Sequence, residues 1–141
     1  MIRGFRHACI VVSDLKRSLK FYRDVIGLKV VKILTIEGEC PDEVFNTKGV
    51  KLTYAKLRSN DQPMSAQPVI ELHYWLRPKR FKKPGFNHIA FTVKNIEREY
   101  KRLKKAGVKF ISKPVKVTYS NSKICFGYDS DNNLIEFIED L

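Results

Sequence analysis

One short strand pattern occurs twice in this chain, and it limits the fold more than any other feature. Residues 5–12 (FRHACIVV) and 86–93 (FNHIAFTV) each place a histidine two residues after a phenylalanine, and each continues as a mostly apolar run of β-strand character. Both runs are followed by apolar residues at helical spacing. The recurrence predicts a duplicated unit in which the same strand, with its histidine, comes first.

A second pattern recurs near the end of each unit. Residues 69–72 (VIEL) and 134–137 (LIEF) are apolar strands, each interrupted by one glutamate. A carboxylate on an apolar strand face is costly unless it is paired, hydrogen-bonded or bound to metal. A single histidine or glutamate of this kind is more often structural, but matching residue types at matching places in both units indicate a divalent metal site. Its predicted ligands are His7, Glu71, His88 and Glu136.

The segments between these markers predict a βαβββ order in each half. Asp14 and Asn95 are the expected helix N-caps, and Gly27 and Gly107 are the expected helix ends. The predicted helices are residues 15–26 and 96–106, and the predicted strands are residues 5–12, 28–36, 50–57, 69–75, 86–93, 108–112, 123–128 and 134–139.

The loops divide the chain into two units. Residues 38–48 are expected to form a loop with one helical turn, and a loop or short edge strand is expected around Pro114. Residues 77–85 are polycationic, contain two prolines and lack periodicity, which is typical of a linker. We therefore predict an α+β chain of two tandem βαβββ modules, residues 1–76 and 86–141, joined by a basic linker at residues 77–85.

Composition limits the location and the partners. No run approaches the roughly 18 apolar residues needed to span a bilayer, and the amino terminus leads directly into a strand, so we expect a cytoplasmic protein without a membrane partner. The net charge of +12, from 27 Lys and Arg against 15 Asp and Glu, favours anionic partners. The basic residues are spread over three segments without an interleaved aromatic motif, so nucleic acid is not expected.

The predicted quartet points to a particular chemistry. Two imidazoles and two carboxylates suit one divalent ion such as Ni, Co, Mn, Fe or Zn. Such an ion polarises a carbonyl or enediolate oxygen, while a neighbouring carboxylate moves a proton. Glu71 or Glu136 is the expected catalytic base. His73, two residues after Glu71, is either a partner of that carboxylate or a residue at the rim of the site.

The chain resembles the vicinal oxygen chelate superfamily. The resemblance covers residues 5–139 and includes the phrases VSDLKRSLKFY (residues 12–22), NHIAF (residues 87–91) and DSDNNLIE (residues 129–136). It implies two modules that form a cupped, barrel-like mixed β-sheet around the ion, commonly in a homodimer. The ligand set looks like that of glyoxalase I, and it is close to that of methylmalonyl-CoA epimerase, which often has glutamine where this chain has Glu71.

The resemblance implies a metal-dependent isomerase, epimerase or lyase. Its substrate would be a small carbonyl compound, anionic or conjugated to a thiol or CoA, and the basic residues 77–83 could meet a negative tail. Glyoxalase I enzymes carry an arginine four residues after the first ligand, where this chain has Val11, which puts the glutathione contacts in doubt. Two alternatives stay open: an extradiol-type dioxygenase, and a non-catalytic protein that binds a drug-like small molecule.

Overall fold

The computed structural model describes residues 1–25, 27–78, 84–128 and 134–141. The first half contains β1 (Ile2–Val11), α1 (Leu15–Leu19), a π-helical segment η1 (Lys20–Val25), β2 (Lys29–Glu37), α2 (Glu39–Val44), β3 (Lys51–Arg58) and β4 (Ile70–Arg77). The second half contains β5 (Gly85–Val93), α3 (Ile96–Lys105), β6 (Val115–Val117), β7 (Ser122–Tyr128) and β8 (Leu134–Asp140). The predicted βαβββ order is confirmed, and α2 is the helical turn expected within residues 38–48.

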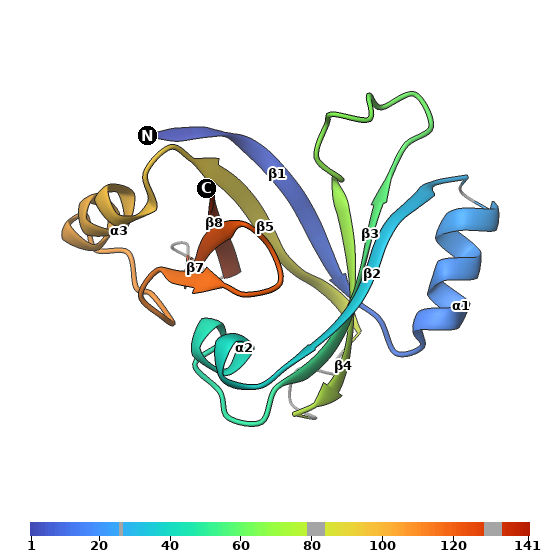
Figure 1. Cartoon of the computed structure of the whole chain (residues 1–141), viewed down its shortest axis with the longest axis horizontal. Helices are drawn as coiled ribbons and strands as arrows, with labels where there is room; N and C mark the ends of the chain where they lie inside the picture. Colours follow the sequence, from blue (N-terminus) through green and yellow to red (C-terminus); the bar gives the residue numbers. More distant parts are fainter. Residues whose placement is uncertain (26, 79–83, 129–133) are drawn as a thin grey trace.

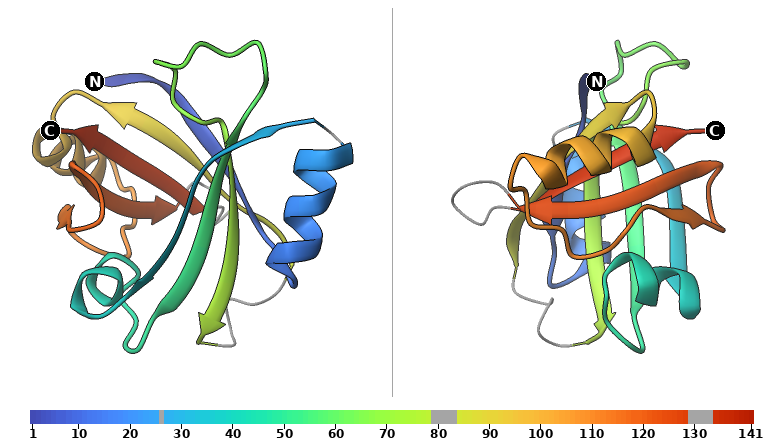
Figure 2. Two further views of the ribbon diagram at one scale, coloured as in Figure 1. Left: turned by 45° about the vertical axis from the view of Figure 1, so that its right-hand side comes forward. Right: turned by 90° about the vertical axis from the view of Figure 1, so that its left-hand side faces the viewer.

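The eight strands of the described residues form one mixed sheet in the order β2-β3-β4-β1-β5-β8-β7-β6. β1 runs parallel to β4, and β5 runs parallel to β8, so the two halves share the same internal order. They meet through the antiparallel pair β1–β5. The sheet curls into a half-barrel, with α1 and α3 on opposite sides of the molecule and α2 between the two halves (Figures 1 and 2). The predicted α+β class and cupped mixed sheet are confirmed.

The helix boundaries follow from the residues that cap them. Asp14 Oδ1 accepts a hydrogen bond from the backbone N–H of Arg17, and Asn95 Oδ1 accepts one from that of Arg98, both at 2.9 Å. Each bond satisfies an amide that has no partner within its own helix. Gly107 follows α3 with φ of 94°, a conformation that residues with a Cβ rarely adopt. The predicted N-caps Asp14 and Asn95 and the predicted helix end at Gly107 are confirmed.

The predicted strand at residues 108–112 is wrong. Only an isolated bridge between Phe110 and Gly127 forms there, and the regular strand β6 begins at Val115. Pro114 lacks a backbone N–H and cannot contribute a donor to a strand ladder. Phe110 instead packs against Tyr100 of α3, with the ring centres 4.6 Å apart. Phe110 also packs against Phe137 of β8, and Ile111 packs against the core, so packing without a strand ladder accounts for the apolar character that had indicated a strand.

The strands on either side of the predicted linker reach its first and last residues. β4 extends to Arg77 and β5 begins at Gly85. Residues 79–83 of the linker, the turn predicted at residues 129–133, and residue 26 at the end of the first predicted helix lie outside the described residues. The division into modules at residues 1–76 and 86–141 stays a prediction.

Aromatic side chains form the core between the two halves. The Phe45 ring, just after α2, lies 4.9 Å from that of Trp75 on β4 and 5.3 Å from that of Phe126 on β7. Trp75 and Phe126 are each 1% exposed, and burying a large apolar side chain contributes about 1.5–3 kcal/mol. The Phe126 ring also lies 5.1 Å from that of His88, edge to face. This packing holds the His88 ring in place.

Candidate metal centre

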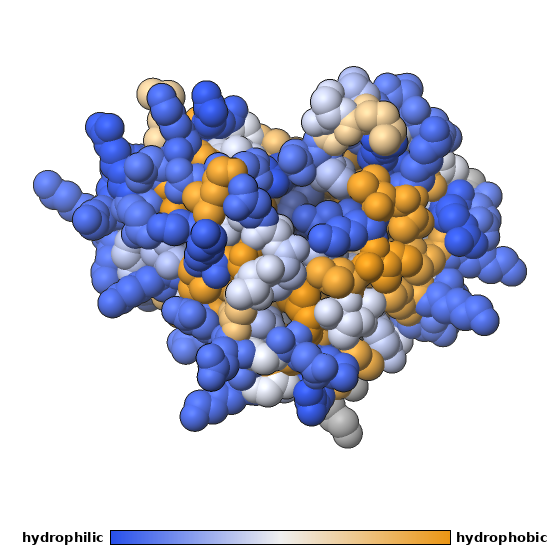
Figure 3. Space-filling model, viewed as in Figure 1, coloured by the Kyte–Doolittle hydropathy of each residue, from blue (hydrophilic) through white to orange (hydrophobic). Residues whose placement is uncertain are grey.

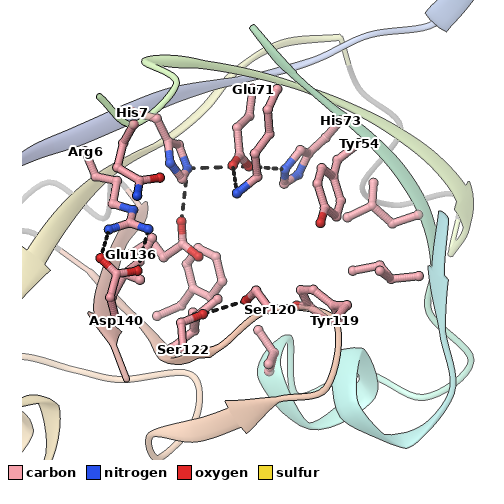
Figure 4. Close-up of a pocket in the computed structure, with 18 of the residues that line it drawn as sticks. Arg6, His7, Tyr54, Glu71, His73, Tyr119, Ser120, Ser122, Glu136 and Asp140 are labelled. Atoms are coloured by element: carbon pink, nitrogen blue, oxygen red, sulfur yellow. Dashed lines mark hydrogen bonds and ion pairs between the residues drawn. The ribbon is translucent and has the colours of Figure 1, made fainter. Parts of the chain in front are cut away.

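An irregularity in β1 turns two neighbouring residues toward the same cavity. Pairing with β5 passes from Phe5–Phe91 directly to His7–Ala90, so Arg6 is the extra residue of a β-bulge. In a regular strand Arg6 and His7 would point to opposite faces of the sheet. Here both are buried and both line the cavity (Figure 4). The bulge therefore supplies a cation next to the first predicted ligand.

The other predicted ligands come from the strands that surround β1. His88 lies on β5 and is fully buried. Glu136 lies on β8, in register with Ala90 of β5, and Glu71 lies on β4, in register with Cys9 of β1. Four adjacent strands, β4, β1, β5 and β8, thus carry one predicted ligand each.

Three of the four predicted ligands converge on one point. The Nε2 atoms of His7 and His88 lie 3.1 Å apart, and Glu136 Oε2 lies 3.1 Å from each of them. All three residues are buried, and their ligand atoms lie within 4.8 Å of one another. Two imidazoles and one carboxylate therefore form a buried group that could hold a metal ion.

Glu71 lies beside this group and has partners of its own. Its Oε2 is 3.6 Å from His7 Nε2 and 3.1 Å from His73 Nε2, and its Oε1 is 3.0 Å from Lys56 Nζ (Figure 4). His73 is 5% exposed, so it is a partner of Glu71 and not a residue at the rim. The role of Glu71 as the fourth ligand stays a prediction.

Sequence reasoning missed Lys56. This residue lies in the alternating pattern of residues 50–57, which does not distinguish it from a solvent-exposed strand lysine. The signal lies in the hairpin register, which places Lys56 of β3 directly opposite Glu71 of β4. In the second half, the corresponding pair across β7 and β8 is Phe126 and Glu136. The two glutamates therefore face a cation in one half and an aromatic ring in the other.

Both carboxylates are held in the ionised form. Burial alone raises the pKa of Glu136, but the interactions with His7 and His88 outweigh it and lower that pKa to about 2. Burial also raises the pKa of Glu71, and there the hydrogen bond with His73 and nearby positive charges bring it well below its ordinary value. Two buried negative charges of this kind require a positive charge beside them.

The two imidazoles respond differently to this environment. Burial lowers the pKa of His7, but the hydrogen bond and charge of Glu136, together with the charge of Glu71, raise it above 6.5 overall. Burial lowers the pKa of His88 below 6.5, since the opposing effect of Glu136 is smaller there. A proton on His7 is therefore one source of the positive charge that the carboxylates require.

A divalent ion is the other source, and the residues present fit one. His88 Nδ1 donates a hydrogen bond to Asn87 Oδ1 at 2.8 Å, so the lone pair of Nε2 faces His7 and Glu136. Metal-bound histidines commonly donate their second N–H in this way. Three electron-rich atoms in contact need a cation between them. A set of two nitrogens and one or two oxygens suits Ni, Co, Mn, Fe or Zn.

A cavity of about 410 Å³ opens beside this group, between the two halves of the chain. In the space-filling view the surface is hollowed there, and hydrophilic side chains border the hollow (Figure 3). The Ser120 and Ser122 hydroxyl oxygens lie 2.6 Å apart on the wall opposite the histidines (Figure 4). Further polar residues of the wall are Arg6, Tyr54, Tyr119 and Asp140.

The fold and the site together define a class: a duplicated βαβββ protein with a buried His/His/Glu group on the central strands of a curled sheet. The profile of the Glyoxalase/Bleomycin resistance protein/Dioxygenase superfamily matches residues 4–137. The chain belongs to this superfamily, which confirms the resemblance found in the sequence.

Individual relatives are distant but match almost the whole chain. A probable lactoylglutathione lyase from Synechocystis sp. is 31% identical over 134 residues, covering 94% of this chain and 92% of that protein. A lactoylglutathione lyase from Haemophilus influenzae is also 31% identical, covering 94% and 90%. The crystal structure of methylmalonyl-CoA epimerase from Mycobacterium tuberculosis has a TM-score of 0.74 at 26% identity, covering 99% of this chain and 89% of that one.

In the part of the chain that the structure describes, no helix has both the length and the apolar character needed to cross a membrane. Val11, where an arginine is expected in glyoxalase I enzymes, is 3% exposed and packs in the core between the two halves. This position therefore places no charge in the cavity.

Proposed function

We propose that this chain is a metal-dependent isomerase, epimerase or lyase that removes a proton next to a carbonyl group and stabilises the resulting enolate or enediolate. The observation that carries the proposal is the buried convergence of His7, His88 and Glu136 beside an open cavity. Membership of the superfamily and the 31% identity to lactoylglutathione lyases support it.

The side chains would supply metal ligands and a proton acceptor. His7, His88 and Glu136 would hold one divalent ion, with Glu71 as the fourth ligand. The bound ion would act as a Lewis acid toward a carbonyl oxygen. Glu71 or Glu136 would move the proton, because both carboxylates are ionised and lie at the cavity. A positioned base of this kind contributes about 10²–10⁴-fold to a rate.

The proposed substrate is a small carbonyl compound that is anionic or conjugated to a thiol or CoA. The relatives are named for lactoylglutathione and methylmalonyl-CoA, and the net charge of +12 favours an anion. Arg77, at the end of β4, is largely exposed and begins the basic segment proposed to meet a negative tail. A cytoplasmic homodimer without nucleic-acid or membrane partners completes the proposal.

Metal content tests the site directly. We expect purified wild-type protein to hold about one divalent ion per chain, and His88→Ala to lose most of it because a ligand and its Asn87-oriented lone pair disappear. Glu71→Gln should bind metal more weakly than wild type. Glu37→Gln is the matched control, since it removes a carboxylate paired with Lys51 outside the cavity. Equal metal content in all four proteins would exclude the metal site.

Proton exchange tests the reaction. The metal-loaded protein is incubated in deuterated water with the glutathione adduct of methylglyoxal or with methylmalonyl-CoA, and deuterium at the carbon next to the carbonyl is measured. Exchange with either compound, lost in His88→Ala, is the expected result. Exchange with only one of them would separate the lyase from the epimerase activity. No exchange with any carbonyl compound would contradict the proposal.

One observation favours a second candidate, the extradiol-type dioxygenase. Two histidines and one carboxylate are the ligand set of many non-haem iron oxygenases, and His7, His88 and Glu136 form such a set, with Glu71 held by Lys56 and His73. Iron-dependent oxygen consumption with a catechol would support this alternative. Proton exchange that is supported by Ni or Co in the absence of oxygen would exclude it.

A further inference from the structure

A lysine lines the cavity and has no role in the reaction proposed above. Lys56 of β3 lies opposite Glu71 of β4, with its Nζ 3.0 Å from Glu71 Oε1. The Lys56 side chain is 27% exposed, and its ammonium lies 5.5 Å from the centre of the Tyr54 ring. Lysines rarely leave water unless they are paired. Both contacts therefore hold the ammonium at the cavity wall.

The surrounding charges leave this lysine with an unmatched positive charge once an ion is bound. Arg6 and Asp140 form a bidentate pair at 2.5 and 2.7 Å and neutralise each other. Glu71 and Glu136 together balance a divalent ion when the histidines are neutral, so the charge of Lys56 remains. In a partly buried cavity such a charge attracts an anion more strongly than it would in open water.

The Lys56 ammonium has more N–H donors than its contact with Glu71 uses. It carries three N–H groups, and within the described ranges Glu71 is the one carboxylate at ion-pair distance from it. The cavity that Lys56 lines is walled on the other side by Tyr119, Ser120 and Ser122 (Figure 4). A ligand placed between these walls can accept hydrogen bonds from the lysine.

We propose that Lys56 binds a carboxylate, or another single oxyanion of similar size, on the substrate. The inference rests on the proposed function, because the carbonyl end of the same molecule must reach the group formed by His7, His88 and Glu136. The cavity of about 410 Å³ is in the range of small-molecule sites. Lys56 thus defines the substrate class as small carbonyl compounds with one further anionic group close to the carbonyl.

Two chelating probes that differ at one end test the inference. Butyrohydroxamate and the monohydroxamate of succinic acid both offer a bidentate metal-binding group, and the second has a carboxylate where the first has a methyl group. We expect nickel-loaded wild-type protein to bind the succinic probe about 10- to 100-fold more tightly, the range for one charged hydrogen bond. Isothermal titration measures both affinities.

Matched variants assign the preference to one residue. In Lys56→Met the preference for the succinic probe should disappear, while the affinity for butyrohydroxamate stays within about threefold of wild type. Lys56→Gln, which keeps a polar side chain opposite Glu71, should lose the preference as well and serves if Lys56→Met does not fold. Lys51→Met is the control, because it removes a lysine paired with Glu37 from the same strand outside the cavity.

Equal affinity of the wild-type protein for the two probes would overturn the inference without any variant. A preference that survives in a folded Lys56→Met or Lys56→Gln protein would overturn it too. If the metal-loaded protein does not bind butyrohydroxamate at all, the proposed function itself fails, and the inference fails with it. The probe with the methyl end, butyrohydroxamate, therefore separates the two failures.

Discussion

Metal binding should release protons from the two imidazoles, and the contacts of His7 and His88 determine how many. His7 Nε2 lies 3.1 Å from Glu136 Oε2, and this carboxylate helps to raise the pKa of His7 above 6.5. The pKa of His88 lies below 6.5 because of burial. At pH 6.5 most of the His7 rings are therefore protonated and most of the His88 rings are neutral. A divalent ion that takes Nε2 of both rings then displaces about one proton.

The sign and size of the effect follow from these pKa values. As the pH falls through the raised pKa of His7, the metal affinity should begin to drop, by about tenfold or 1.4 kcal/mol per pH unit. Below the lowered pKa of His88 a second proton competes, and the drop should approach about a hundredfold per unit. Well above the pKa of His7 the affinity should not depend on these two groups.

Isothermal titration with nickel in buffers of different ionisation enthalpy counts the released protons. A His7→Asn variant is the internal control: it should bind metal more weakly, and its affinity should lose the first of the two pH dependences. Release of no proton near pH 6.5, or an affinity that is constant between about pH 5 and about pH 7, would refute this account of the imidazoles.

Four other changes have expected outcomes. Asn87→Ala should weaken metal binding by about 10- to 100-fold, measured against a chromophoric chelator, because His88 loses the acceptor that fixes its tautomer; unchanged affinity would contradict this. Phe126→Ala should lower the unfolding free energy by about 3–5 kcal/mol in urea. Asn95→Ala should lower it by about 1 kcal/mol through loss of the α3 cap. A metal ion at about 100 times its Kd should raise the unfolding free energy by about 2.7 kcal/mol, and a chelator should reverse this gain.

The fold was predictable because the βαβββ pattern occurs twice in the sequence, once in each half. Alternating apolar residues mark the strands, and capping residues mark the helix ends. The second half shows the same local patterns as the first. Asp14 and Asn95, for example, accept equivalent hydrogen bonds in the two halves. The convergence of His7, His88 and Glu136 was predictable for the same reason, since equivalent strands in a duplicated sheet place equivalent residues near its axis.

Features that depend on pairing between strands were not predictable. The bulge at Arg6 is a property of the β1–β5 register, and the contact of Lys56 with Glu71 is a property of the β3–β4 register. Neither leaves a local signal in the sequence. The predicted strand around Phe110 failed because buried side chains that pack without a strand ladder give the same apolar pattern: Phe110 contacts Tyr100 and Phe137, and its pairing with β7 is one isolated bridge.

The duplicated scaffold gives its two glutamates different environments, and this difference has a consequence for any chemistry at the site. Opposite Glu136 lies Phe126, so among the described residues its charge is balanced by His7 and His88, or else by a bound ion. Opposite Glu71 lies Lys56, a second cation with which Glu71 can pair when it is not on the ion. Leaving a buried carboxylate without a cation is strongly unfavourable. We therefore expect Glu136 to stay on the ion throughout, and Glu71 to be the ligand that can move away and leave a position for the substrate.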